Sequence, residues 1–181
     1  VEKCGEIKLT TLEVDHSSPC IGYSFYFKRR PKFDIEKANY NNVPKILWNK
    51  LQKENKSIEL NGITYMPNMV MGQPRKGIKL SFITDSRPLI TMNEFIKDSD
   101  LFICEGTYGC DEDIHKAIKN KHMTFREAAY LAKEGNVKKL LLTHFSTAMA
   151  DPEFYVDSAL RVFKNTIVGS DRLQLNLQFE D

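Results

Sequence analysis

The chain has 181 residues, of which 41% are hydrophobic and 28% charged, and its formal net charge is +2. This length suffices for one domain with a buried core but not for two domains of ordinary size. The composition excludes a disordered chain. No apolar run approaches the ~18 residues of a membrane-spanning helix, so we expect no membrane partner.

The cysteines give an expectation about the cellular compartment, and the first residues give one about whether the chain is a fragment. Cys4, Cys20, Cys104 and Cys110 show neither CxxC nor zinc-finger spacing, which favours reduced thiols in a cytoplasmic protein. The chain begins with Val1 rather than methionine, and its opening already reads as a strand. We therefore expect a piece of a longer protein.

The first part of the chain predicts two strands and then an excursion from their sheet. Residues 6–14 and 22–27 are typical of strands, and a turn-like segment separates them. Residues 28–57 are polar and helical, with two prolines as breaks. Residues 58–67 predict a hairpin whose turn is Asn61-Gly62.

The excursion, residues 28–69, carries most of the positive charge. Nine basic and three acidic residues between Lys28 and Lys56 give that segment a charge of +6, so the remainder is net −4. A basic segment on an acidic body suits a polyanion such as nucleic acid. A solvated lysine-rich surface is the alternative.

From residue 78 onward, strands alternate with helices. The clearest helix begins after Thr124, which forms a capping box with Glu127, and Gly135 is placed to end it. This alternation predicts an α/β sheet buried on at least one face. The expected strands are residues 78–84, 100–104, 137–143 and 172–179, and the expected helices are 91–99, 111–120, 124–135 and 151–165.

Titratable residues follow three consecutive strands directly. Asp85 follows LSFIT, Glu105 follows LFIC and His144 follows LLLT. Sites in open α/β sheets gather at the carboxyl ends of strands, and His16, after TTLEVD, is a fourth candidate. A helix cap at Asp85, and satisfied polar groups at the other strand ends, are the structural alternatives.

The chemistry of these side chains suits a metal. His16, Asp85 and His144 offer the nitrogen and oxygen donors that Zn²⁺ takes, and zinc hydrolases use such donors to activate water. His122 stands just before the capped helix, where Glu105, if nearby, would stabilise a protonated imidazole as a proton donor. An exposed loop histidine is the alternative at this position.

Four segments in this order resemble ribonuclease Z of the metallo-β-lactamase superfamily. VDHSSPCIGYSF resembles its histidine-containing segment before a Gly-Tyr strand, and KGIKLSFITDSRP its Gly-Asp-Thr-Arg motif. DLFICEGTY resembles its His-Glu-Ala-Thr motif, and HMTFREAAYLAKEGNVKKLLLTHFS the helix and strand that lead to its last metal histidine. The resemblance implies an αββα sandwich, of which residues 1–181 form the C-terminal half with residues 28–69 inserted as an arm.

The resemblance also implies roles for individual residues. His16, Asp85 and His144 become metal ligands, and Glu105 with His122 protonates the leaving 3′-oxygen. The complete enzyme of this family holds two zinc ions, with manganese as the alternative metal. The family's His-x-His-x-Asp-His motif is absent from this sequence, so the N-terminal half or a second subunit of a homodimer has to supply those ligands. We expect the chain alone to be inactive.

The implied function is cleavage of the 3′ trailer of precursor tRNA, with the arm binding the RNA. The arm lacks the family's Gly-Pro pair, which keeps open a hydrolase of another phosphodiester on the same fold. A non-catalytic RNA-binding or scaffold module is the second alternative. The predicted RNA contacts are Lys28, Arg29, Arg30, Lys32, Lys45, Lys50 and Lys53.

Overall fold

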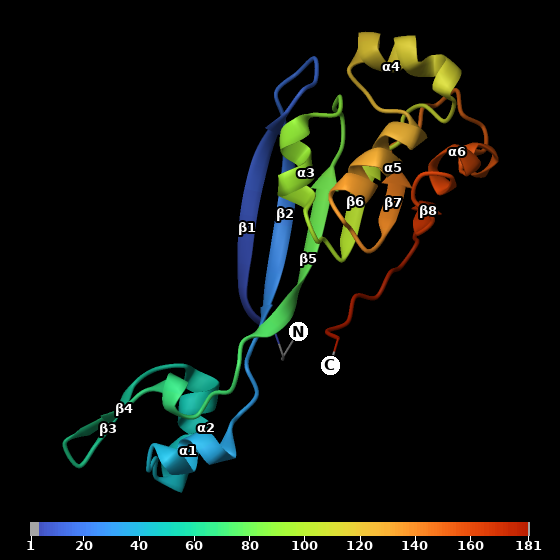
Figure 1. Ribbon diagram of the computed structural model, residues 1–181. Helices are drawn as coiled ribbons and strands as arrows, with labels where there is room; N and C mark the ends of the chain where they lie inside the picture. The colour runs from blue at the N-terminus through green and yellow to red at the C-terminus, as the bar shows by residue number, and fades with distance from the viewer. Residues whose placement is uncertain (1–3, 181) are drawn as a thin grey trace. The chain divides into compact units, whose positions relative to one another are not determined.

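The computed structural model describes residues 4–180 and divides the chain into two compact units (Figure 1). The smaller unit holds Arg29–Lys76 together with the described residues before Glu6. The larger unit holds Glu6–Lys28 and the chain from Gly77 onward. Within residues 4–180, no helix combines the length and the apolar character that crossing a membrane requires.

The larger unit is built on a six-stranded sheet with the strand order β1-β2-β5-β6-β7-β8. β5 pairs with β6, β6 with β7 and β7 with β8, each time in parallel. The carboxyl ends of these four strands therefore lie at the same edge. The strands are β1 (Cys4–Val14), β2 (Cys20–Arg29), β5 (Arg75–Ile83), β6 (Leu101–Glu105), β7 (Leu140–Thr143) and β8 (Thr166–Val168).

Helices connect the parallel strands. Thr124 caps the longest of them as predicted, because its hydroxyl accepts from the Glu127 amide while the Glu127 carboxylate accepts from the Thr124 amide. The helical elements are α3 (Ile90–Ile96), η2 (Asp111–Asp113), α4 (Ile114–Asn120), α5 (Phe125–Glu134), η3 (Pro152–Tyr155) and α6 (Asp157–Leu160).

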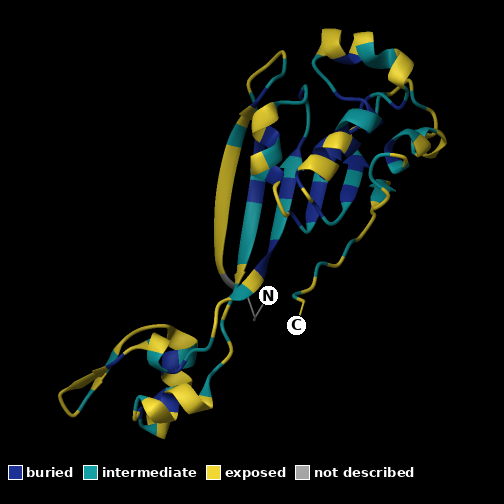
Figure 2. Ribbon diagram, in the orientation of Figure 1, coloured by how far each residue is buried: buried dark blue, intermediate teal, exposed yellow. Residues whose placement is uncertain are grey.

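The main core lies where α3 and α5 pack against one face of the sheet (Figure 1). Phe102, Leu140 and Leu142 from β6 and β7 are buried against Phe125 of α5 and Met92 of α3. Each such side chain stabilises the fold by ~1.5–3 kcal/mol. Figure 2 shows burial concentrated in β6 and β7, whereas the edge strand β1 is exposed. The carboxyl ends of β6 and β7 are therefore anchored in the buried part of the unit.

The C-terminal part of the chain differs from the prediction. The expected helix over residues 151–165 is shorter, because α6 ends at Leu160 and the chain then turns into β8, which the sequence reading missed. β8 places β-branched residues against β7. The strand expected over residues 172–179 is wrong, since no strand is assigned to that segment within the described chain. Alternating leucines form a strand only where neighbouring backbone groups are free to pair.

The smaller unit has a core of its own, which includes Ala38, Leu51 and Val70. The predicted hairpin is confirmed, with β3 and β4 antiparallel and positive φ angles of 52° and 76° at Asn61 and Gly62. Its elements are α1 (Ile35–Tyr40), α2 (Lys45–Glu54), β3 (Ile58–Leu60), β4 (Ile63–Tyr65) and η1 (Pro67–Met69).

Candidate metal centre

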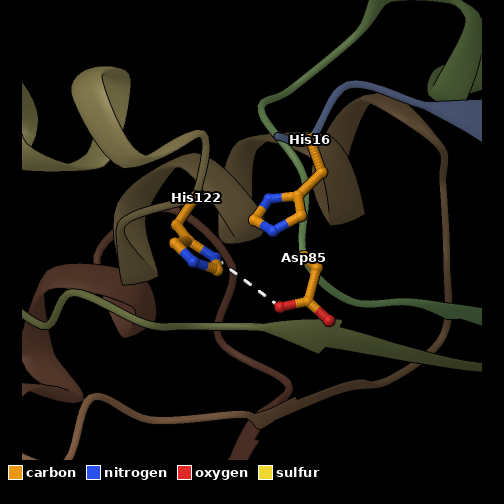
Figure 3. A group of neighbouring side chains, drawn as sticks. All are labelled: His16, Asp85 and His122. Carbon is orange, nitrogen blue, oxygen red and sulfur yellow. Dashed lines mark ion pairs between the residues drawn. The ribbon is translucent and has the colours of Figure 1, made fainter. Parts of the chain in front are cut away.

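Five of the predicted site residues lie together at the carboxyl edge of the sheet. Asp85 follows β5 after one residue, Glu105 is the last residue of β6, and His144 follows β7 directly. His16 comes from the turn after β1, and His122 precedes the cap of α5. Figure 3 shows the imidazoles of His16 and His122 gathered around the Asp85 carboxylate.

Short distances join these side chains into one cluster. Asp85 Oδ1 lies 3.0 Å from His144 Nε2 and 4.0 Å from His122 Nδ1. Ligand atoms of His16, Asp85 and His122 all lie within 4.8 Å of one another, and so do those of Glu105, His122 and His144. His122 therefore belongs to both groups of potential metal ligands.

The backbone turns sharply at two of the predicted ligands. Asp85 has φ of 50° and His144 has φ of 58°. This left-handed conformation costs a non-glycine residue ~1–3 kcal/mol, although Asp and His tolerate it better than most. The conformation takes each side chain out of the strand direction and toward the other. The position of His144 at the end of a buried strand is thus explained by the direction in which it points.

A backbone carbonyl fixes the tautomer of His16. Its Nδ1 lies 3.2 Å from the Lys121 carbonyl oxygen, which only accepts, so Nδ1 carries the proton. Nε2 keeps its lone pair and lies 3.2 Å from the exposed Ser17 hydroxyl. The Lys121 ammonium binds Asp15 at 2.7 Å and holds this turn in place. His16 thus presents Nε2 as a donor to a metal.

Thr107 orients His144 in a similar way. Its hydroxyl lies 2.6 Å from Glu105 Oε2, to which it donates, and 3.2 Å from His144 Nδ1, from which it accepts. This arrangement holds the His144 ring by Nδ1, and Nε2 faces Asp85. Thr107 is buried, so solvent does not compete for these hydrogen bonds.

Glu105 is fully buried, and its carboxylate is surrounded by donors. Oε1 accepts from the Ser86 amide at 2.6 Å, and Oε2 accepts from the Met123 amide at 3.0 Å and from Thr107. His122 Nδ1 lies 3.1 Å from both oxygens. These hydrogen bonds offset the cost of burying the carboxylate. Glu105 therefore holds the His122 ring by one nitrogen and leaves Nε2 free.

No protein-family model matches the chain. Among curated proteins, the chain is 62% identical over 176 residues to ribonuclease Z of Clostridium beijerinckii, and 58% identical over 175 residues to that of Clostridioides difficile. The chain is homologous to ribonuclease Z. Each match covers 97% of the chain, and the chain spans 57% of the length of each of these relatives. The resemblance stated from the sequence motifs is confirmed.

Solved structures show the fold of this ribonuclease Z homologue. The short form of human tRNase Z aligns with a TM-score of 0.57 at 17% identity, over 98% of this chain and 48% of that one. The metallo-β-lactamase fold protein YhfI from Bacillus subtilis aligns with a TM-score of 0.55 at 19% identity, over 91% of this chain and 46% of that one. The predicted metallo-β-lactamase α/β fold is confirmed.

The donor set of this ribonuclease Z homologue fits a divalent metal ion. Zinc takes imidazole nitrogen and carboxylate oxygen, and two ligands of one tetrahedral ion at ~2.1 Å lie roughly 3.4 Å apart. The 3.0 Å between Asp85 Oδ1 and His144 Nε2 is close to that value. Both His16 and His144 also have the hydrogen-bonded second nitrogen that is typical of metal ligands.

Arg87 is a part of the site that the sequence reading missed. Its guanidinium donates to both carboxylate oxygens of Glu127 and to the His122 carbonyl. Its amide donates to the Asp15 carbonyl at 3.0 Å. Arg87 thus ties the loop of Asp85 to the segments that carry His122 and His16. Its place two residues after Asp85, where the Gly-Asp-Thr-Arg motif has its arginine, is the signal in the sequence that points to it.

The cysteines near the site are structural. Burial raises the pKa of the Cys20 thiol, and the nearby carboxylates of Asp85 and Glu105 raise it further. Burial raises the pKa of Cys104 well above its usual value, and its side chain packs in the main core. Both thiols therefore stay protonated near neutral pH.

The predicted RNA contacts do not belong to this cluster. They lie at or beyond the end of β2, and all but Lys28 fall in the smaller unit. Lys28 pairs with Glu6 at 2.7 Å. All but Arg29 are exposed, as cations that bind a polyanion have to be: Lys28, Arg30, Lys32, Lys45, Lys50 and Lys53. Their role stays a prediction.

Proposed function

We propose that this chain is the C-terminal portion of a metal-dependent phosphodiesterase that removes the 3′ trailer of precursor tRNA. One observation carries the proposal: a ribonuclease Z homologue gathers three imidazoles and two carboxylates at the carboxyl edge of its sheet. The fold positions them from five separate segments. Two of the five, Asp85 and His144, stand in left-handed conformations whose local cost a favourable interaction has to offset.

In this proposal His16, Asp85 and His144 hold zinc, and the complete enzyme holds two ions, with manganese as the alternative. The remaining ligands come from the N-terminal portion or from a second subunit of a homodimer. When bound, such ions stabilise negative charge on phosphoryl oxygens and activate water for attack. The 3.0 Å between the Asp85 carboxylate and the imidazole of His144 supports an ion shared by the two side chains.

In the same proposal His122 and Glu105 deliver a proton to the leaving 3′-oxygen. Glu105 accepts from His122 Nδ1 and stabilises a positive charge on the ring. The proton on Nε2 is then available for the leaving 3′-oxygen of the cleaved phosphodiester. The buried position of Glu105 strengthens this interaction, because water screens it little.

The basic arm supplies affinity for RNA. Its exposed lysines and arginines neutralise phosphates and release counterions, without reading the base sequence. Binding through this arm would therefore weaken steeply as the salt concentration rises. The acidic remainder of the chain directs the RNA to the arm, because it repels phosphates.

The test is cleavage by the full-length protein of a precursor tRNA and of a small chromogenic phosphodiester. Cleavage of the precursor after the discriminator nucleotide, lost on removal of metal by a chelator, supports the proposal. Equal or better turnover of the small ester with no precursor cleavage favours another phosphodiester as the substrate, the candidate suggested by the missing Gly-Pro pair. No stoichiometric zinc or manganese in the full-length protein favours a non-catalytic RNA-binding module.

A further inference from the structure

A pocket of about 280 Å³ opens beside the metal cluster, between the segments that follow β6 and β7. Ligand pockets are typically ~300–1,000 Å³, so this one suits a single ring-sized group better than a chain of nucleotides. Its walls include two aromatic side chains, a lysine and two small residues: Tyr108, Tyr155, Lys116, Ser146 and Ala148.

The pocket shares a wall with the proposed catalytic residues. Thr107 lines the pocket, and its hydroxyl also contacts Glu105 and His144. The ring of Tyr108, another lining residue, lies 6.5 Å from the ring of His122. A group bound in the pocket would therefore lie next to the atoms at which a phosphodiester would be cleaved.

Backbone hydrogen bonds hold the first wall of the pocket in place. The Tyr108 amide donates to the Met123 carbonyl at 3.1 Å, and the Phe125 amide donates to the Tyr108 carbonyl at 2.9 Å. The Ser146 amide donates to the Thr107 carbonyl at 3.1 Å. The pocket is thus formed before any ligand enters, which spares the cost of ordering it on binding.

Tyr155, the second aromatic residue of the pocket wall, packs against Gly109. A Cβ atom at Gly109 would lie 2.3 Å from Cγ of Tyr155, so only glycine allows this ring to pack on the loop. The Ser158 hydroxyl lies within hydrogen-bond distance of the Gly109 and Tyr155 carbonyls, at 3.2 and 2.9 Å. Tyr155 is therefore fixed at the pocket rather than free to leave it.

We propose that this pocket binds the nucleobase next to the scissile phosphate, an inference that rests on the proposed cleavage of RNA. Tyr108 and Tyr155 are aromatic residues of the pocket wall, and stacking on aromatic rings accepts any base. Lys116 is a cation in the pocket wall with a side chain that is 68% exposed, and it pairs at 2.6 Å with Asp113, which also lines the pocket. The pairing leaves other N–H donors of the ammonium for a ligand. This cation suits the phosphate attached to the base.

The test uses the full-length protein with its metal and compares binding of the four nucleoside 5′-monophosphates with ribose 5-phosphate, which lacks the base. Ala148→Trp fills the pocket from an exposed position, and Ala150→Trp adds the same ring at an exposed position that does not line it. In the wild type and in Ala150→Trp, we expect at least one nucleotide to bind about tenfold tighter than ribose 5-phosphate in calorimetric titration.

In Ala148→Trp this preference should vanish, and in Tyr155→Ala it should fall severalfold. Equal binding of nucleotides and ribose 5-phosphate by the wild type overturns the proposal, as does an unchanged preference in Ala148→Trp. Precursor tRNA cleavage by the same wild-type protein distinguishes a failure of the base-pocket proposal from a failure of the proposed function. Cleavage without base-dependent binding refutes the base pocket alone, whereas base-dependent binding without cleavage supports the pocket and counts against the proposed function.

Discussion

Replacing Arg87 by alanine should loosen the fold and the metal site together. The guanidinium bridges the Glu127 carboxylate and the His122 carbonyl, and the paired side chains are 17% and 21% exposed. An exposed ion pair contributes ~0–1 kcal/mol, and breaking a fully buried one costs ~3–5 kcal/mol. Because this pair lies between these limits, we expect Arg87→Ala to lower the free energy of unfolding by about 2–3 kcal/mol.

Thermal unfolding and metal titration measure the two effects. A domain of this size loses ~2–4 °C in Tm per kcal/mol, so the expected decrease is roughly 4–12 °C. Within the described chain the guanidinium touches no proposed metal ligand, and it acts on Asp85 only through the loop that it ties to Glu127 and His122. We therefore expect a severalfold loss of zinc affinity in competition with a chelator, less than the ~10–100-fold that is typical of residues bonded to a ligand. Arg87→Lys should recover only part of the lost Tm and of the lost zinc affinity, because an ammonium cannot bind the carboxylate through two parallel hydrogen bonds.

Arg126 provides a matched control on the same helix as Glu127. It pairs with Asp111 at 2.7 Å, and the two side chains are 37% and 45% exposed. Arg126→Ala should therefore cost less than ~1 kcal/mol and leave zinc affinity unchanged. If Arg87→Ala matched Arg126→Ala in both Tm and zinc affinity, the claim that Arg87 organises the site would be refuted.

Three further predictions concern the full-length protein. His144→Ala should remove at least one metal equivalent, measured by elemental analysis, and abolish hydrolysis; full metal content would contradict its role as a ligand. His122→Ala should retain its metal but lower kcat by ~10²–10⁴-fold, and normal turnover would exclude it as the proton donor. Replacing the seven predicted RNA contacts by glutamine should weaken RNA binding and flatten its salt dependence, with small-ester hydrolysis unchanged as the control; an unaltered salt slope would rule out the arm as the RNA contact.

Local signals in the sequence predicted the elements that local interactions determine. The cap of α5 depends on Thr124 and Glu127, three residues apart, and the hairpin turn on adjacent Asn61 and Gly62. The strand prediction for residues 172–179 failed because a strand also needs a neighbouring strand to pair with, which the alternating leucines do not reveal. For the same reason β8 was missed, since its pairing with β7 is a long-range property.

The same difference between local and long-range signals applies to the site residues. Asp85, Glu105 and His144 were found because each directly follows an apolar run, a pattern that the sequence displays. Arg87 and Thr107 were missed because their importance depends on partners 40 and 37 positions away, Glu127 and His144. A single sequence gives the residues that end strands but not the hydrogen bonds that orient them.

The left-handed residues connect the fold to the proposed chemistry. Ile83 of β5 and Leu142 of β7 both pair with Cys104, so Asp85 and His144 hold equivalent positions in the sheet. β6 lies between the two strands, so an ordinary continuation of β5 and β7 would leave the two side chains on one face but roughly 9–10 Å apart. The positive φ angles of Asp85 and His144 redirect the chain. The hydrogen bonds that the Ser86 amide donates to Glu105 and that His144 Nδ1 donates to Thr107 lie immediately beside these turns. Bringing the Asp85 carboxylate to His144 Nε2 offsets the strain only if the two side chains gain something there. In the proposed function that gain is a shared cation, which both donors can bind at once.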